Sequence, residues 1–320
     1  MSPFKSLAVK GGSKGKELVI DVDDPSPRSK RTRFSTEVND PDLFRSYAAF
    51  QNYTTYFRDA PLLVERTIDQ SSLLDTNIPI WFATKDWNFL LSNLEDAYEN
   101  LVKEFYANAI VEGEETKCWV RGKHFSVSPA YLAEILNINR PILPIPPVYD
   151  ELTLDEETLQ EALGANLEFS SNGKSISVAS LSPELRLLTM IICNNLYPLS
   201  STRYMNLGQA LFLHDLISDV EIDVCSHIFH IVAKTVDRTA SRNCIPFCRL
   251  ISLILKLKGV HPSEDKHPYP RPSPINICTL HASMSHTKKN TKQESHTSKG
   301  SSSSTSHAYC EQLDNIMATL

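Results

Sequence analysis

The sequence predicts a mainly α-helical, multi-helix globular domain with one small β-hairpin, flanked by disordered N- and C-terminal tails. Three observations support this fold class. Apolar residues recur at helical spacing through much of residues 39–261, a serine or aspartate followed by proline marks several helix starts, and both ends of the chain are polar. The 320 residues, of which 41% are hydrophobic and 22% charged, suffice for one large domain with tails.

The N-terminal tail, residues 1–38, is rich in lysine, serine, aspartate and proline, and it has too few apolar residues to form a core. Four basic residues lie close together in this tail: Arg28, Lys30, Arg31 and Arg33. Such a cluster is typical of a nuclear-import signal or of an arm that contacts phosphates, although a solvated tail explains it equally well. The import reading makes the nucleus one location of a protein that we expect to be intracellular.

The first predicted helix starts near Asp40, a good N-cap, with Pro41 at its first position. An aromatic and apolar stripe follows at helical spacing: Leu43, Phe44, Tyr47, Phe50, Tyr53, Tyr56 and Phe57. Such a stripe is more often part of a core than a stacking platform for bases. Residues 61–68 fit either a strand or a short helix, because periodicity does not decide between them.

The next stretch predicts helices around a hairpin. Residues 81–111 carry apolar residues at three- and four-residue steps and fit one or two helices. Residues 118–127 alternate in apolar and polar character around a Gly122-Lys123 turn, which predicts the β-hairpin. A helix that starts at Ser128-Pro129 is expected to run through Leu136.

After a proline-rich connection at 140–150, residues 155–163 predict a short acidic helix. The densest apolar stretch, residues 181–260, then predicts four consecutive helices that pack as antiparallel neighbours. Their predicted starts are Ser182-Pro183, Ser200-Ser201-Thr202, Asp219 and Pro246. Beyond this domain, residues 262–307 are rich in serine, histidine and lysine and predict a disordered segment. Residues 308–320 regain a helical pattern and predict a short helical end.

Charge and cysteine usage limit the partners of the domain. Residues 39–261 contain ten more acidic than basic residues, which argues against broad binding of phosphate backbones by the folded part. The seven cysteines are odd in number and follow no secretory signal, so we expect reduced thiols in an intracellular protein. The longest apolar runs, such as Leu250–Leu255, are far shorter than a membrane span, and no membrane partner is expected.

No pattern predicts a metal, cofactor or small-molecule site. Cys244 and Cys248 could begin a zinc site with Cys225, His227 and His230, but Pro246 separates the first two and the other three do not share one helix face. Buried core cysteines are the better explanation. The glycine-rich patch at residues 12–16 lacks the spacing of a phosphate-binding loop.

One acidic run invites a catalytic hypothesis. It consists of Asp215, Asp219, Glu221 and Asp223, and transposases and integrases arrange such carboxylates around two metal ions. The expected surroundings are helical and lack the strands that such sites use, so helix caps and solvated loops explain these residues more simply. The Asp-Ser/Thr-Gly and Gly-x-Ser-x-Gly motifs of other hydrolases do not occur. We therefore expect no catalytic residues.

Several short motifs together resemble a known family. They are Glu104-Phe105-Tyr106-Ala107-Asn108, Val120-Arg121-Gly122-Lys123, Leu196-Tyr197-Pro198 with Ser200-Ser201-Thr202, the Ala210–Ile217 helix, and Ile245-Pro246-Phe247 leading to Gly259-Val260. In this order and spacing, over about residues 40–260, they resemble the putative plant transposon protein domain, which is itself similar to an open reading frame of Athila-type long-terminal-repeat retrotransposons. The resemblance implies a transposon-derived protein and transfers no catalytic residue. Cys248 and Arg249 depart from the small or apolar residues that the pattern leads us to expect.

These observations favour a non-enzymatic structural or accessory element of a plant retrotransposon that self-associates through apolar helix faces. One alternative is a nucleic-acid-binding protein that uses the basic arm at Arg28–Arg33. The other is a degenerate transposase that acts through the acidic run.

Overall fold

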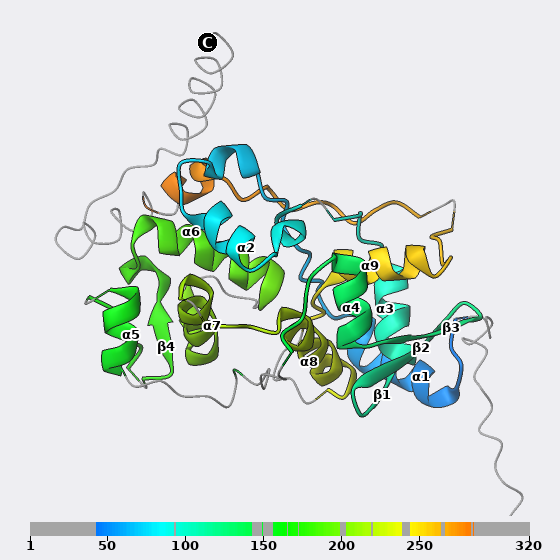
Figure 1. Ribbon diagram of the computed structural model, residues 1–320. Helices are drawn as coiled ribbons and strands as arrows, with labels where there is room; N and C mark the ends of the chain where they lie inside the picture. Colours follow the sequence, from blue (N-terminus) through cyan, green and yellow to red (C-terminus); the bar gives the residue numbers. More distant parts are fainter. Residues whose placement is uncertain are drawn as a thin grey trace, which may run out of the picture. The chain divides into compact units, whose positions relative to one another are not determined.

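The structure is a computed structural model that describes residues 43–92, 94–142, 149, 156–164, 166–171, 173–198, 203–218, 220–238, 244–263, 266–282 and 284 (Figure 1). All of them belong to one compact unit of the chain, residues 40–320. The predicted tail 1–38, the residues after Met284 and the predicted helical end 308–320 lie outside the described residues.

Helices dominate the described residues, as the sequence predicts. The α-helices are α1 (Tyr47–Asn52), α2 (Ile78–Thr84), α3 (Glu99–Asn108), α4 (Pro129–Leu136), α5 (Glu156–Leu163), α6 (Pro183–Ile191), α7 (Leu207–Ile217), α8 (Val224–Val236) and α9 (Cys248–Leu257). Short helical turns are η1 (Tyr53–Phe57), η2 (Gln70–Leu73), η3 (Asn88–Leu91), η4 (Val178–Ser180) and η5 (Ile192–Leu196). The strands are β1 (Ile110–Glu112), β2 (Glu115–Val120), β3 (Lys123–Val127), β4 (Ser175–Ser177) and β5 (Tyr204–Asn206).

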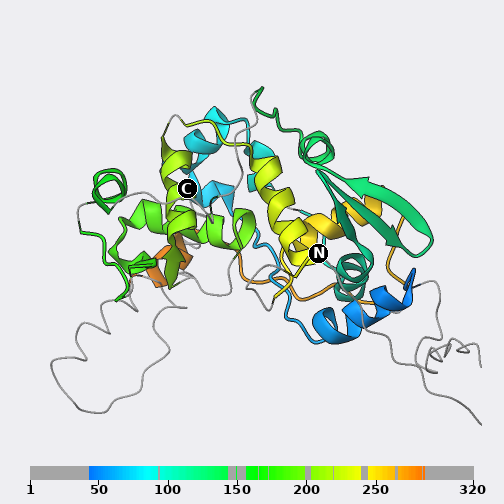
Figure 2. The same cartoon turned by 90° about the horizontal axis from the view of Figure 1, so that it is seen from below.

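Helix α3 is largely buried, with other elements packed around it. Every residue from Leu101 to Asn108 is buried, and the helix packs against α9, α1, η1 and β2 (Figures 1 and 2). The Tyr106 hydroxyl donates a hydrogen bond to the carbonyl of Pro246 at 3.0 Å, and the Asn108 amide donates to the carbonyl of Leu43 at 2.8 Å. Polar groups of α3 therefore hold the chain just before α9 and just before α1.

The predicted hairpin is confirmed, although its turn is Arg121-Gly122 and not the predicted Gly122-Lys123, and the sheet gains a strand. β2 and β3 pair antiparallel with Val120 opposite Lys123, and the two residues between them, Arg121 and Gly122, have φ angles of 48° and 77°. Two left-handed residues in a two-residue turn match the twist of the strands. β1 pairs with the other edge of β2, so the sheet has three strands, and β4 and β5 form a separate antiparallel pair.

An ion pair fixes this sheet to the core. Arg121 binds Glu104 of α3 with two parallel hydrogen bonds of 2.9 Å, from Nε to Oε2 and from Nη2 to Oε1. Glu104 is buried, and a bidentate guanidinium–carboxylate pair is the strong form of this interaction. Two of the motifs that carry the family resemblance are thus joined by a structural contact.

Two of the predicted helix starts are confirmed by their caps. The Ser128 hydroxyl accepts a hydrogen bond from the amide of Tyr131, and the Ser182 hydroxyl accepts one from the amide of Leu185. The inner face of α6 carries Leu187, Leu188 and Ile191, which are buried, as is Ile192 at the start of η5. The predicted acidic helix appears as α5, although Asp155 lies outside the described residues.

Three other starts differ from the predictions. The first helix is capped by Ser46 and not by Asp40, which lies outside the described residues. α7 is capped by Asn206 in place of the predicted 200–202 segment. α8 is capped by Asp223 and not by Asp219. In each case the cap is a side chain closer to the first turn of the helix. Its oxygen accepts a backbone N–H group of that turn, which has no partner within the helix.

The region around residue 61 is extended, which resolves the choice between strand and short helix. Leu62 forms a parallel bridge with Ile245, and Ile68 forms one with Ile275. In residues 81–111 the apolar pattern is divided among the end of α2, the turn η3 and α3.

Helix α9 begins in an unusual way. Its N-cap residue, Phe247, has a left-handed φ of 53°, and its side chain cannot accept a hydrogen bond. The carboxylate of Glu65 takes the place of a cap, since its two oxygens accept the amides of Arg249 at 2.8 Å and Leu250 at 2.9 Å. An anion is favourable there because of the positive end of the helix dipole.

Arg249 lies inside the protein although it departs from the expected apolar pattern. Its Nε donates to the carbonyl of Glu95 at 2.8 Å, and its Nη2 donates to the carbonyl of Leu94. A guanidinium that satisfies loop carbonyls can be buried at a modest free-energy cost. This contact fixes the register of α9.

Residues 266–282 differ from the predicted disordered segment, because they pack on the domain. Ile275 is fully buried, and its amide donates to the carbonyl of Thr67 at 2.8 Å. The amide of Tyr269 donates to the carbonyl of Ala97 at 2.7 Å, and Arg271 pairs with Asp96. Figure 1 shows this stretch, in yellow to orange, running from the end of α9 back toward α6. Backbone pairing holds the segment, and composition does not reveal such pairing.

Candidate interaction surfaces

The predicted site residues fall into two groups. Arg28, Lys30, Arg31 and Arg33 lie outside the described residues, so the basic arm stays a prediction from the sequence. The acidic run and the cysteine–histidine group are described, apart from Asp219.

Asp215 and Asp223, two described members of the acidic run, have separate partners. Asp215 accepts a hydrogen bond from the hydroxyl of Tyr149 at 3.1 Å and lies 2.8 Å from Nδ1 of His214. Asp223 accepts the amide of Ser226 at 2.9 Å and pairs with Arg140 at 2.7 Å. Glu221 is exposed.

Burial by itself would raise the pKa of Asp223, but the hydrogen bonds from Arg140 and Ser226 outweigh it and lower the pKa below its usual value. Asp223 is therefore an ionised helix cap that ties residue 140 to the start of α8.

The cysteine–histidine group belongs to the core. Cys225, Cys244 and Cys248 are all buried, as the sequence predicts. Burial, and then the charge of Asp223, raises the pKa of Cys225 to about 12, which makes a thiolate unfavourable. His227 packs among aromatic rings, with its centroid 4.6 Å from Tyr197. In the described part of the chain, no three His, Cys, Asp or Glu side chains gather in a way that could hold a metal ion.

The first candidate surface is apolar and centres on α2. Ile78 and Phe82, one helical turn apart, are fully buried and attach α2 to the core. Ile80 lies between them on the opposite face and is 61% exposed, and Leu74 just before the helix is 74% exposed. Residues 76–84 contain no charged side chain. We call Leu74 and Ile80 the α2 surface.

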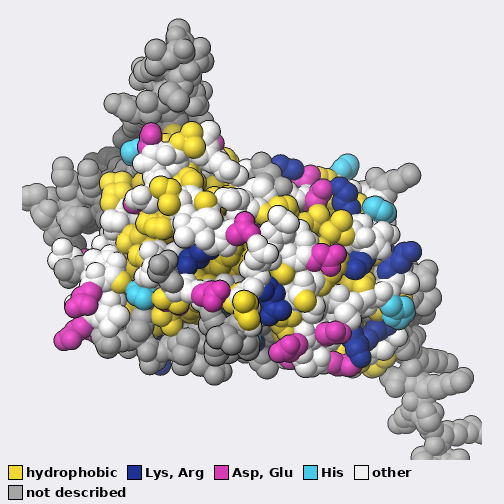
Figure 3. Space-filling model, viewed as in Figure 1, with side chains coloured by type: hydrophobic (Ala, Val, Ile, Leu, Met, Phe, Trp, Pro, Cys, Tyr) yellow, Lys and Arg dark blue, Asp and Glu magenta, His cyan; other side chains and the backbone are white. Residues whose placement is uncertain are grey.

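Contacts at both ends hold this surface in place. The backbone amide and the side-chain amide of Asn77 both donate to the carboxylate of Glu184 at the start of α6. At the other end, Lys85 donates to the carbonyls of Ser218 at 3.2 Å and Val220 at 2.6 Å. In the space-filling view, hydrophobic side chains gather on the left-hand part of this face, over α6, while charged side chains are more numerous on its right-hand part (Figure 3).

The second candidate surface is aromatic and runs along α1 and η1. Ala49 and Phe57 face the core and are buried, whereas Tyr47 is 38% and Tyr56 is 50% exposed. The predicted core stripe is thus only partly covered. Phe44, Phe50 and Tyr53 are half-buried and form ring contacts, with centroids 5.6 Å apart for Phe44–Phe50 and 5.0 Å apart for Phe44–Tyr53. We call Phe44, Tyr47, Phe50, Tyr53 and Tyr56 the aromatic surface.

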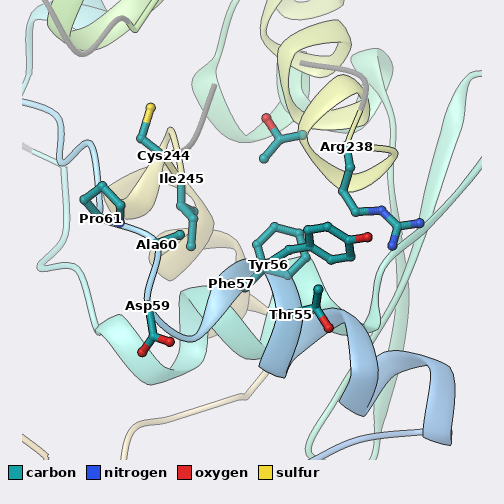
Figure 4. A pocket seen from close by; sticks show the side chains of 10 residues that line it. Thr55, Tyr56, Phe57, Asp59, Ala60, Pro61, Arg238, Cys244 and Ile245 are labelled. Atoms are coloured by element: carbon teal, nitrogen blue, oxygen red, sulfur yellow. The ribbon is translucent and has the colours of Figure 1, made fainter. Parts of the chain in front are cut away.

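A hollow of about 500 Å³ opens beside Tyr56. Its lining includes the side chains of Thr55, Asp59 and Thr235. Arg238, at the end of α8, places its guanidinium 4.8 Å from the centre of the Tyr56 ring and donates to the side-chain oxygen of Asn52 at 2.7 Å. Figure 4 shows Tyr56 and Arg238 together on one side of the hollow, with Ala60, Pro61 and Ile245 on the other.

Neither surface follows directly from the sequence pattern. Periodicity places Ile80 and Tyr56 among apolar and aromatic neighbours, but it does not show which face of each helix is covered. The absence of charge from residues 76–84 was the one available signal for the α2 surface.

Comparisons with known proteins place the chain in a family. A family model described as "Putative plant retrotransposon-related domain" matches residues 84–261, more than half of the chain. No curated protein matches, and no solved structure matches. The matched range runs from the end of α2 to just past α9 and so contains α3, the three-stranded sheet and the buried Arg249. None of the described helices is long and apolar enough to cross a membrane. The chain belongs to the putative plant retrotransposon-related domain family.

Proposed function

We propose that this protein is a non-enzymatic structural or accessory element of a plant retrotransposon, and that it self-associates through the α2 surface. The observation that carries the proposal is the exposure of Ile80 on a charge-free helix whose opposite face is fixed in the core. An apolar face held in water adds nothing to the stability of the domain, and a second apolar surface that covers it removes it from water.

The geometry of association follows from symmetry. In a two-fold pair, the same patch of each copy meets the other, so Leu74 and Ile80 of both copies become buried together. Complete burial of one such side chain contributes about 1.5–3 kcal/mol. Association also costs several kcal/mol of rigid-body freedom, so the four side chains support a concentration-dependent complex and not a permanent one.

Sedimentation velocity over a range of protein concentrations tests the proposal. The wild-type chain should shift from a smaller to a larger species as its concentration rises, and Ile80→Glu combined with Leu74→Glu should keep it monomeric. The matched control is Leu257→Glu, which charges an exposed leucine on α9 and should associate like the wild type. A wild-type chain that stays monomeric throughout, or a double variant that associates normally, would contradict self-association at this surface.

The basic arm supports a second candidate function, nucleic-acid binding. Its four cations within six positions contrast with the acidic domain that follows. Binding through this arm alone should weaken steeply with salt, because it depends on the release of counterions from phosphates. The experiment at the end of the next subsection separates this function from the one argued there.

A further inference from the structure

The aromatic surface has features that self-association through α2 does not explain. Folded proteins usually cover large aromatic rings, because each ring removes a large apolar area from water when buried. Here five rings lie within residues 44–56, and none of them is fully buried. Ala49 and Phe57 anchor α1 and η1 to the core, and Phe44 and Tyr53 also pack against it, whereas Tyr47 and Tyr56 are exposed and leave much of their ring area in water.

The shape of the segment leaves Tyr47 and Tyr56 exposed near its two ends. α1 changes into the wider turn η1 at Tyr53, whose backbone amide bonds back to both Ala49 and Phe50. Single π-turns of this kind are rare within helices and occur frequently at functional sites. The Phe44–Phe50–Tyr53 ring group lies at the start of the segment, and Tyr56 lies at its end beside the hollow.

Arginines accompany the rings. Arg45 and Arg58 flank the α1–η1 segment, Arg238 follows α8, and all three are exposed. Arg58 pairs with Asp59 at 3.3 Å, and the exposed acid next to Arg238 is Asp237. This leaves the local balance slightly positive, in contrast to the acidic domain as a whole. The guanidinium of Arg238 lies over the Tyr56 ring, which makes a cation–π pair at the edge of the hollow.

We propose that the aromatic surface binds single-stranded nucleic acid by stacking its bases on Tyr47 and on the Tyr56–Arg238 pair. Every base has a flat π-face, so stacking requires no particular sequence, and nearby arginines can contact the backbone phosphates. The hollow beside Tyr56 gives room for a base turned out of the strand, and its volume falls within the range of ligand pockets in proteins.

A duplex does not fit this chemistry. Its bases are stacked on one another, so their faces are not available to side chains outside the helix. Its recognition would depend on a broad basic surface, and residues 39–261 are acidic overall. The aromatic surface therefore favours a single strand over a duplex of the same length.

Fluorescence anisotropy with the full chain and a labelled single-stranded oligo-uridine of about 15 nucleotides tests the proposal. Removing a stacked ring costs about 1–3 kcal/mol per base, so Tyr56→Ala and Tyr47→Ala should each weaken binding by about 5- to 150-fold. Tyr56→Phe and Tyr47→Phe keep the ring and should bind within about twofold of the wild type. Far-ultraviolet circular dichroism of each variant checks that it remains folded.

The chain offers a close control elsewhere on its surface. Tyr204 is 41% exposed, and Arg203 lies 5.7 Å from the centre of its ring, so it resembles the Tyr56–Arg238 pair without the neighbouring rings. Tyr204→Ala should bind the oligonucleotide like the wild type. An equal loss in Tyr204→Ala and Tyr56→Ala would show that any exposed tyrosine suffices and would overturn the proposal.

Neutralising the arm separates the two nucleic-acid hypotheses. In one variant of the full chain, four arm residues are changed to alanine: Arg28, Lys30, Arg31 and Arg33. This variant should bind the oligonucleotide more weakly at low salt. Adding Tyr56→Ala to it should weaken binding by the same factor as Tyr56→Ala does in the wild type. Binding that disappears with the arm and ignores the tyrosines would support the arm and refute the aromatic surface. No binding by any chain would refute both, and neither result affects the sedimentation test of the α2 surface.

Discussion

Glu65 shows how much one side chain can decide in this molecule. It is fully buried, and it accepts the first free amides of α9 from a position 184 residues earlier in the chain. Burial raises its pKa above the usual value of 4.5, while the hydrogen bonds from Arg249 and Leu250 act in the opposite direction and are outweighed. Nothing within four residues of Glu65 or of Phe247 indicates this contact, so the sequence alone could not predict it.

The raised pKa makes the stability contributed by Glu65 depend on pH. A carboxyl group with a higher pKa in the folded state stabilises the fold most below its unfolded pKa, and this contribution declines as the pH rises through the folded pKa. The difference in unfolding free energy between the wild type and Glu65→Gln should therefore be largest near pH 4.5 and fall at higher pH. Urea unfolding of both chains from about pH 4.5 to about pH 8 measures it. A difference that rises with pH would contradict the direction of the shift.

At the scale of elements, helix starts depend on which polar side chain reaches the first turn. Asn206 accepts the amide of Gln209 at 2.8 Å, and the Gln209 side chain accepts the amide of Asn206 at 3.1 Å. This capping box lies close to the serines and threonine at 200–202, which are common caps by composition. The sequence contained the Asn-x-x-Gln signal. Its three-residue spacing predicts the start of α7 better than the cluster of hydroxyl residues before it does.

The capping box gives a direct prediction for α7. Asn206→Ala should lower the unfolding free energy by about 1 kcal/mol, because the amide of Gln209 loses its acceptor. Asn206→Asp keeps a side-chain oxygen at this position and should cost much less. Urea denaturation of both variants measures the difference. Equal losses would show that the oxygen of residue 206 does not cap the helix.

At the scale of the whole molecule, residues 266–282 connect segments that lie far apart in the sequence. Their backbone pairs with Thr67, Asp69 and Ala97, and Arg66 donates to the carbonyl of Ser273 at 2.7 Å. The family match ends at residue 261, so this packed stretch follows directly after the matched region. Its proline and histidine content suggested disorder, because composition shows that the segment has few apolar residues for a core. Composition does not show that backbone groups distant in the sequence are available to pair with it.

Ile275 tests whether this segment contributes to the stability of the domain. Ile275→Ala removes a fully buried side chain and should lower the unfolding free energy by about 2–5 kcal/mol. Ile142 is almost completely exposed, and Ile142→Ala should change it by less than about 0.5 kcal/mol. Thermal and urea unfolding of the two variants provide the comparison. Similar small effects would mean that residues 266–282 do not pack on the domain in solution.

The sequence by itself determined the features that depend on neighbours within a few residues. These include the caps at Ser128 and Ser182, the hairpin within residues 118–127 and the family membership. Helix caps and tight turns are set by local backbone angles and by hydrogen bonds that span three or four positions, so a linear pattern records them.

Only the tertiary structure decided which faces are covered and which distant groups meet. Glu65 caps α9, Ile275 pairs with Ile68, and Ile80 and Tyr56 stay at the surface among residues of similar character that are buried. Periodicity predicts that a helix has an apolar face, but the burial of that face depends on segments brought close by the whole fold. The two proposed interaction surfaces exist because the fold uses one side of α2 and of α1–η1 and leaves the other side in water.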